Sequence, residues 1–175
     1  MSNWFGVSVA VPLGIGLCTT FAALRPGSAD WHLRLRKPRY NAPHEALLPI
    51  FVLLFTLGGI GSYLVANEMT LAQHTPAPVA ARAGQLGLGF YWLGLTFAAF
   101  WPRLMAFGPS LVLALADLGV GGMFYVLAMV QFFRLSILGG LLLLVCVGGI
   151  AGLATWNAAL VQIEREGALP FWIRE

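Results

Sequence analysis

The chain alternates between long apolar segments and short polar ones. Apolar residues run almost unbroken through five segments, near residues 4–24, 46–66, 84–104, 109–133 and 136–163. A helix that crosses a hydrocarbon core about 30 Å thick needs about 20 apolar residues, whereas a β-barrel would show alternating segments of about 10. The pattern therefore predicts an all-α membrane protein, a bundle of five transmembrane helices.

The third segment is the least regular, because four glycines lie in its first half and Pro102 interrupts its end. The longest polar connections are 25–45 and 67–83, and neither is long enough to separate two domains. We therefore expect residues 1–175 to form a single transmembrane domain. The first apolar segment has no basic region before it, which favours a retained helix over a cleaved signal peptide.

Composition agrees with a lipid environment. The chain is 59% hydrophobic and 10% charged, whereas soluble domains carry about 25% charged residues. Its mean hydropathy is +0.81. Too few charges remain to cover a water-facing surface, so a soluble protein is excluded. Cys18 and Cys146 both lie in apolar segments, and a disulfide framework is therefore not expected.

Basic residues are distributed unequally between the two ends of the predicted bundle. The face formed by the first loop, the third turn and the C-terminus carries Arg25, Arg34, Arg36, Lys37, Arg39, Arg103, Arg165 and Arg174. The opposite face carries only Arg82 and Arg134. By the positive-inside rule, loop 25–45 and the C-terminus are expected on the cytoplasmic side and the N-terminus on the opposite side.

Glycines are concentrated in the apolar segments, where small residues let membrane helices approach closely. Gly148 and Gly152 have the GxxxG spacing. Tight packing inside one bundle and a dimer interface both account for them.

Motifs of soluble enzymes are absent from the sequence. His32, His44 and His74 have no metal-ligand partner at helical spacing, and no phosphate-binding or nucleophile motif is present. We expect no metal, no required cofactor and no enzymatic activity. Anionic lipid accounts for the basic residues of the first loop more simply than nucleic acid, so membrane lipids are the expected partners and nucleic acid is not.

Asp117 is the one ionisable residue that interrupts an apolar segment. Such a residue usually faces the bundle interior with a partner, so it predicts either a ligand contact or an interhelical hydrogen bond. At 1.5 Å per residue, Asp117 lies about 12 Å, and Asn157 and Phe51 about 9 Å, from the same membrane face. These polar and aromatic residues stand out from the apolar segments and lie at a similar depth. They predict a pocket beneath loop 25–45, with the loop as its lid.

Several stretches resemble the TspO/MBR family. They are "WHLRLRKPRYNAPH" from Trp31, "PIFVLLFTLGGIGSYLV" from Pro49, the Trp101–Pro102 pair, "ALADL" around Asp117, and Asn157 in the fifth segment. The resemblance implies a five-helix bundle, often dimeric, that binds porphyrins, sterols and synthetic ligands under its first loop.

The sequence departs from the family pattern at aromatic positions. A pocket Trp of the family is Phe51 here, the Trp after Lys-Pro is Tyr40, and the Trp of the fifth helix is Gly149. The Asn-Trp before the Trp-Pro pair becomes Ala98-Ala99. We expect these smaller side chains to enlarge the cavity and to weaken porphyrin binding. Some family members degrade porphyrin through pocket tryptophans, and the replacements argue against that activity.

The resemblance and the depth pattern together give a candidate ligand site. Its expected residues are Tyr40, Asn41, Pro43, His44, Leu47, Phe51, Trp101, Leu113, Asp117, Leu153, Trp156 and Asn157. The leading hypothesis is a membrane protein that binds, and transports or senses, an apolar planar ligand such as a tetrapyrrole, sterol or isoprenoid, with porphyrin or lipid as the expected bound molecule. The alternative is an accessory subunit of a larger membrane complex whose pocket has degenerated. A homodimer or a larger membrane complex is the expected assembly.

Overall fold

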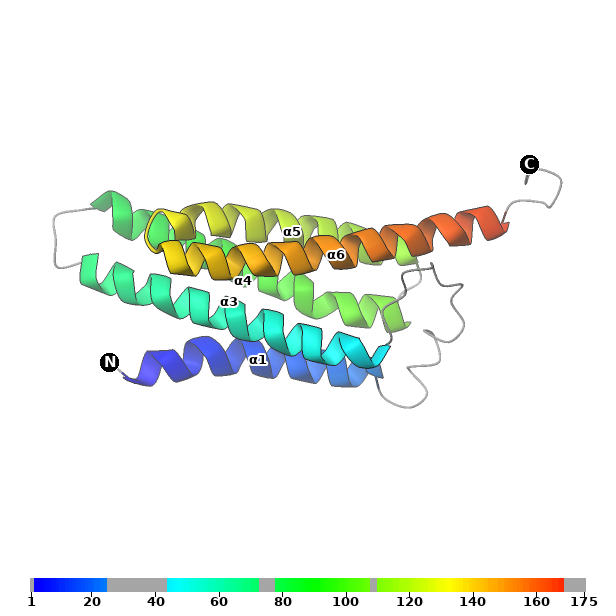
Figure 1. Cartoon of the computed structure of the whole chain (residues 1–175), viewed down its shortest axis with the longest axis horizontal. Coiled ribbons are helices and arrows are strands. Elements are labelled where there is room, and N and C mark those ends of the chain that lie inside the picture. The colour runs from blue at the N-terminus through cyan, green and yellow to red at the C-terminus, as the bar shows by residue number, and fades with distance from the viewer. Residues whose placement is uncertain (1, 25–43, 73–77, 108–109, 169–175) are drawn as a thin grey trace.

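A computed structural model describes residues 2–24, 44–72, 78–107 and 110–168, and these residues form five long helices. The helices are α1 (Ser2–Leu24), α3 (His44–Ala72), α4 (Pro78–Phe107), α5 (Leu111–Phe133) and α6 (Ile137–Ala168). They lie side by side in an up-and-down bundle (Figure 1). The prediction of an all-α, five-helix bundle is confirmed.

The helices form a closed ring in the order α1, α3, α6, α5, α4, with a further contact between α3 and α4 across it. The C-terminal ends of α1, α4 and α6 and the N-terminal ends of α3 and α5 lie at one end of the bundle, on the right in Figure 1. Arg103 and Arg165 therefore lie toward this end, and Arg82 and Arg134 toward the other. Which end faces the cytoplasm stays a prediction.

Three helical segments are long and apolar enough to cross a membrane: Ala46–Leu71, Leu111–Phe133 and Ile137–Gly167. Gly6–Phe21 in α1 is a shorter apolar helix. Helix α4 is less apolar, as its glycines suggested, but its 30 residues span about 45 Å at 1.5 Å per residue. Pro102 does not end α4, which continues to Phe107.

Helix ends and close approaches follow from local sequence. Ser110 caps α5, since its side chain accepts a hydrogen bond from the Val112 amide at 3.1 Å. Gly59 lets α3 approach α1, because a Cβ there would lie 2.8 Å from the backbone oxygen of Ser8. Gly148 and Gly152, in contrast, have open space where a Cβ would project. Packing inside the bundle therefore does not explain the GxxxG pair.

Candidate functional site

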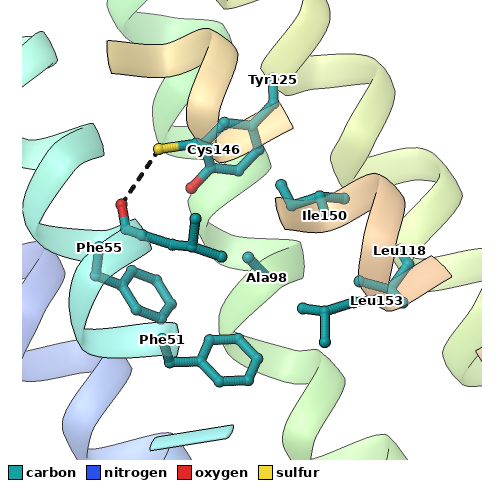
Figure 2. Close-up of a pocket in the computed structure, with 9 residues that line it drawn as sticks. Phe51, Phe55, Ala98, Leu118, Tyr125, Cys146, Ile150 and Leu153 are labelled. Atoms are coloured by element: carbon teal, nitrogen blue, oxygen red, sulfur yellow. Dashed lines mark hydrogen bonds between the residues drawn. The ribbon is translucent and has the colours of Figure 1, made fainter. Parts of the chain in front are cut away.

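A cavity lies inside the bundle between α3, α4, α5 and α6 (Figure 2). Its lining residues are Phe51, Leu54, Phe55, Ala98, Leu118, Tyr125, Cys146, Ile150 and Leu153. The cavity measures about 20 Å³, on a scale on which one water needs roughly 10–15 Å³. The space in this conformation is therefore small, and a larger ligand requires side chains to move.

The cavity wall is almost wholly apolar. Tyr125 and Cys146 contribute its only polar side-chain atoms among the lining residues, and the ring of Tyr125 extends from α5 toward Cys146 in Figure 2. The Cys146 thiol donates a hydrogen bond to the backbone oxygen of Leu54 at 3.3 Å. Because that bond occupies the thiol, the Tyr125 hydroxyl is the principal polar group that the wall offers to a ligand.

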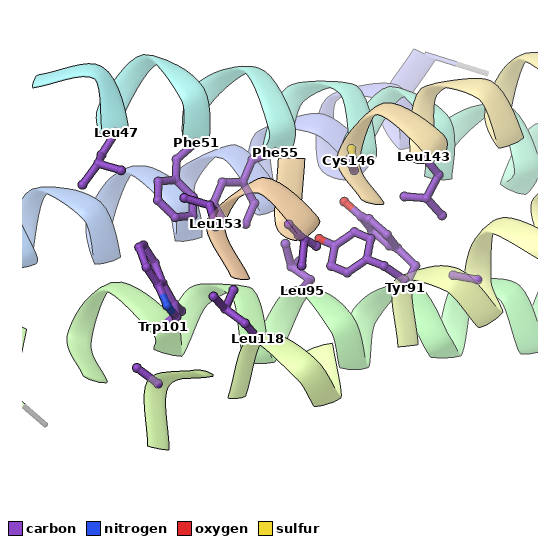
Figure 3. Close-up of a cluster of buried hydrophobic side chains, with 14 of the residues drawn as sticks. Leu47, Phe51, Phe55, Tyr91, Leu95, Trp101, Leu118, Leu143, Cys146 and Leu153 are labelled. Carbon is purple, nitrogen blue, oxygen red and sulfur yellow. The ribbon is translucent and has the colours of Figure 1, made fainter. Parts of the chain in front are cut away.

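Aromatic rings continue from the cavity toward the end of the bundle where α4 ends (Figure 3). Phe51 stacks on Phe55 with ring centroids 5.8 Å apart, and it also contacts Trp101 at 5.7 Å. Trp101 meets Trp156 edge-on at 6.2 Å. These distances lie in the range in which aromatic pairs attract one another. The rings thus form a continuous apolar wall over three helices.

Asn157 anchors this aromatic wall by hydrogen bonds. It is fully buried. With its amide oriented to satisfy both ends, Nδ2 donates to the Leu111 carbonyl at 3.2 Å and Oδ1 accepts from Trp101 Nε1 at 3.1 Å. The reversed amide would direct Nδ2 at Met105 Sδ, 3.4 Å away, which is a weak acceptor. The first orientation joins α6 to both α4 and α5.

Asp117 does not take part in this network. It is half-buried on α5, it does not line the cavity, and its buried Oδ2 has no hydrogen-bond partner among the described residues. The predicted interhelical hydrogen bond of Asp117 is therefore not formed within the described residues, and the Asn157 amide is directed at Trp101 and Leu111 instead.

The other predicted site residues fall into four groups. Phe51 and Leu153 line the cavity, and Leu47, Trp101, Trp156 and Asn157 are buried in the core beside it. Leu113 is 47% exposed on the outer face of α5, so its assignment to the cavity is wrong. Tyr40, Asn41 and Pro43 lie outside the described residues, as does the lid formed by the loop, and the side chain of His44 is not described.

Several lining residues were not predicted, although helical spacing could have found them. Phe55 lies one turn from Phe51 on α3, and Ile150 and Cys146 lie one and two turns from Leu153 on α6. Leu118 follows Asp117 directly. Extending Phe51 and Leu153 along their own helix faces would have identified Phe55, Ile150 and Cys146.

The expected enlargement of the cavity at Gly149 is absent, because Leu54 occupies the space. A Cβ placed on Gly149 would lie 2.7 Å from both terminal carbons of Leu54. The side chain that the glycine lacks is therefore replaced by a leucine from the facing helix. The prediction that small residues enlarge the pocket is wrong at this position.

Chemically, the site suits an apolar molecule rather than a metal. No group of three His, Cys, Asp or Glu side chains in the described segments could hold a metal ion. The polar network around Asn157 is satisfied among the described residues. The wall can contact an apolar ligand over a wide area and offer it a hydroxyl at Tyr125.

Comparison with known proteins relates this chain to one protein family. The profile of the TspO/MBR family matches residues 8–163. A translocator protein from Sus scrofa is 32% identical over 128 residues, which cover 73% of this chain and 70% of that protein. Translocator proteins from Ovis aries and Homo sapiens are 36% and 34% identical over 70 residues, covering 39% of this chain and 41% of each relative.

Proposed function

This chain belongs to the TspO/MBR family of membrane proteins, and we propose that it binds an apolar molecule in the cavity between α3, α4, α5 and α6. The observation that carries the proposal is the wall itself. Its nine side chains come from four helices and present two polar atoms, one of which is already hydrogen-bonded. Ligand sites of this kind are mostly apolar with a few polar groups that fix orientation.

Ligand shape follows from what fills the cavity. A tetrapyrrole is a rigid plate that needs room in two directions at once, and a cavity of about 20 Å³ offers no such slot. A narrow chain can enter when Leu54 and Leu153 change rotamer, since both side chains are flexible. We therefore propose an isoprenoid-like chain as the preferred ligand, ahead of a sterol or a porphyrin.

The polar end of such a ligand has one natural partner inside the cavity. The hydroxyl of Tyr125 can donate to or accept from an alcohol or a carbonyl group. An isoprenoid alcohol therefore matches the wall better than a pure hydrocarbon does. Binding is the step that transport and sensing share, and the proposal concerns that step. We also propose that the ligand enters the cavity under loop 25–45, and that this loop lies on the cytoplasmic side.

An accessory subunit of a larger membrane complex is the second candidate. The small cavity favours it, and so does the open space at Gly148 and Gly152, which lets another helix approach α6 closely. Co-purification of a stoichiometric partner from native membranes, with no ligand bound in the purified protein, would support this candidate over the first.

Ligand binding is tested by native mass spectrometry of the purified protein titrated separately with geranylgeraniol, cholesterol and protoporphyrin. Ala98→Phe fills the cavity, and Ala116→Phe adds the same ring on the exposed face of α5. We expect geranylgeraniol to bind most tightly, and Ala98→Phe to weaken it at least tenfold while Ala116→Phe does not. Equal binding by the two variants, or no binding of any probe, would contradict the proposal.

A further inference from the structure

A second recess lies outside the bundle, on the lipid-facing side between α1 and α4. Ile15 and Thr19 line it from α1, and Trp92, Thr96, Phe100 and Arg103 are among the residues that line it from α4. Its volume is about 300 Å³, far larger than that of the inner cavity. Helix α4 separates the two spaces, since Ala98 faces the inner cavity and Ala99 faces this outer groove.

The groove has the length of one membrane leaflet. Trp92 and Arg103 are eleven residues apart on one helix, a rise of about 16 Å. Half of a hydrocarbon core is about 15 Å thick. Arg103 lies near the end of α4, toward the membrane surface, and Trp92 lies toward its middle. The groove therefore runs from the headgroup region to the centre of the bilayer.

The wall of the groove presents little unsatisfied polarity to an apolar occupant. Thr19 donates its hydroxyl to the backbone oxygens of Ile15 at 2.9 Å and Gly16 at 3.1 Å. Thr96 donates its hydroxyl to the backbone oxygen of Trp92 at 2.9 Å. Because each hydroxyl hydrogen is used within its own helix, an acyl chain can cover both threonines without stranding a hydroxyl donor.

One end of the groove is cationic. Arg103 is exposed at the groove mouth, and it forms no ion pair or hydrogen bond within the part of the chain that the structure describes. A guanidinium presents several donors in a planar fork that matches phosphate oxygens. An arginine at this depth therefore attracts an anionic headgroup while the acyl chain fills the apolar length beside it.

We propose that the groove between α1 and α4 is a binding site for an anionic phospholipid, with one acyl chain along Ile15, Thr96 and Phe100 and the headgroup at Arg103. A second copy of the chain is the less favourable occupant. In a symmetric membrane dimer the two-fold axis runs along the membrane normal, so docking at this groove would bring both Arg103 side chains to the same depth. The like charges would repel each other.

Headgroup selectivity tests the role of Arg103. Delipidated protein is titrated with dioleoylphosphatidylglycerol or dioleoylphosphatidylcholine, which share acyl chains and differ in net charge, and bound lipid is counted by native mass spectrometry. We expect the wild type to bind the anionic lipid about fivefold more tightly, as about 1 kcal/mol per basic residue predicts. Arg103→Gln should abolish this preference, whereas Arg82→Gln, an exposed arginine toward the other end of α4, should retain it.

Groove filling tests the acyl-chain site independently. Thr96→Phe places a ring in the groove, and Thr155→Phe is the control, since Thr155 is also exposed and donates its hydroxyl to its own helix at 2.8 Å. We expect Thr96→Phe to weaken both lipids at least fivefold and Thr155→Phe to weaken neither. Equal behaviour of the two threonine variants, or of the two arginine variants, overturns the proposal. A changed dimer fraction with unchanged lipid binding would assign the groove to a second copy and also overturn it.

Discussion

Removal of the Asn157 side chain should destabilise the bundle mainly through Trp101. In Asn157→Ala the indole N–H of Trp101 loses its acceptor, 3.1 Å away, in a region where both side chains are buried. The carbonyl of Leu111 keeps its own helical hydrogen bond, because it lies in the first turn of α5. The stranded indole donor therefore dominates the polar part of the loss.

The magnitude follows from the environment. A buried donor without a partner costs about 1–3 kcal/mol in soluble proteins, but interhelical hydrogen bonds in membranes average about 0.6 kcal/mol and reach about 1.7. We therefore expect the coupling energy between Asn157 and Trp101 to lie at about 0.6–1.7 kcal/mol. A double-mutant cycle of Asn157→Ala and Trp101→Phe isolates this energy, because the packing changes of each single variant cancel.

The free energy of unfolding can be measured by titrating detergent-solubilised protein with sodium dodecyl sulfate while following helix content. Thr155→Ala serves as a control that removes an exposed hydroxyl bonded within its own helix. The variant Asn157→Ala alone should lose about 1 kcal/mol or more. A coupling energy below about 0.3 kcal/mol would refute the hydrogen bond between Asn157 and Trp101, and would favour the reversed amide that faces Met105.

Three further predictions follow from the cavity and its surroundings. Asp117→Ala should leave the free energy of unfolding unchanged or raise it by up to about 1 kcal/mol, because a carboxyl group without a partner is costly at membrane depth; a clear loss on the same titration would indicate an undetected partner. Gly149→Trp should lower that free energy by about 1–3 kcal/mol through the clash with Leu54, and Leu54→Ala should restore it, whereas Gly152→Trp, where the space is open, should be tolerated. Purified protein should not accelerate the loss of protoporphyrin in light beyond a detergent control, because Phe51 is harder to oxidise than an indole; rapid loss would identify Trp101 or Trp156 as the electron donor.

Helix number and approximate position could be predicted from the sequence because membrane thickness sets the length of an apolar segment. The helix ends could not, since α3 and α6 continue beyond their apolar segments into polar residues such as Asn67 and Glu164. Those residues lie where water or headgroups can solvate them, and hydropathy marks only the part of a helix that lipid surrounds. The predicted depth of Phe51 was enough to place it at the cavity, and Leu153, which was predicted as a site residue, also lines it.

The rotational position of a helix is harder to predict in lipid than in water. Leu113 and Leu118 are equally apolar and lie on the same helix, yet one is exposed and the other lines the cavity. In a soluble protein the outward position would be polar, and the period of the pattern would identify the inner face. Lipid removes that contrast. Asp117 indicated a depth along α5. A single polar residue could not show which neighbouring helix or side chain it faces.

Compensation between helices explains why the missing aromatic side chain at position 149 did not leave a large cavity. Gly149 on α6 and Leu54 on α3 lie far apart in the sequence, and the glycine read alone predicts empty space. The two terminal carbons of Leu54 occupy the position where a side chain at 149 would begin. A leucine can change rotamer, unlike the indole that the family resemblance implies at position 149. We therefore expect that the wall can open for a narrow chain without unfolding a helix. The same exchange leaves no flat side chain at position 149 on which a porphyrin would stack, and it therefore supports our proposal of a narrow chain as the ligand.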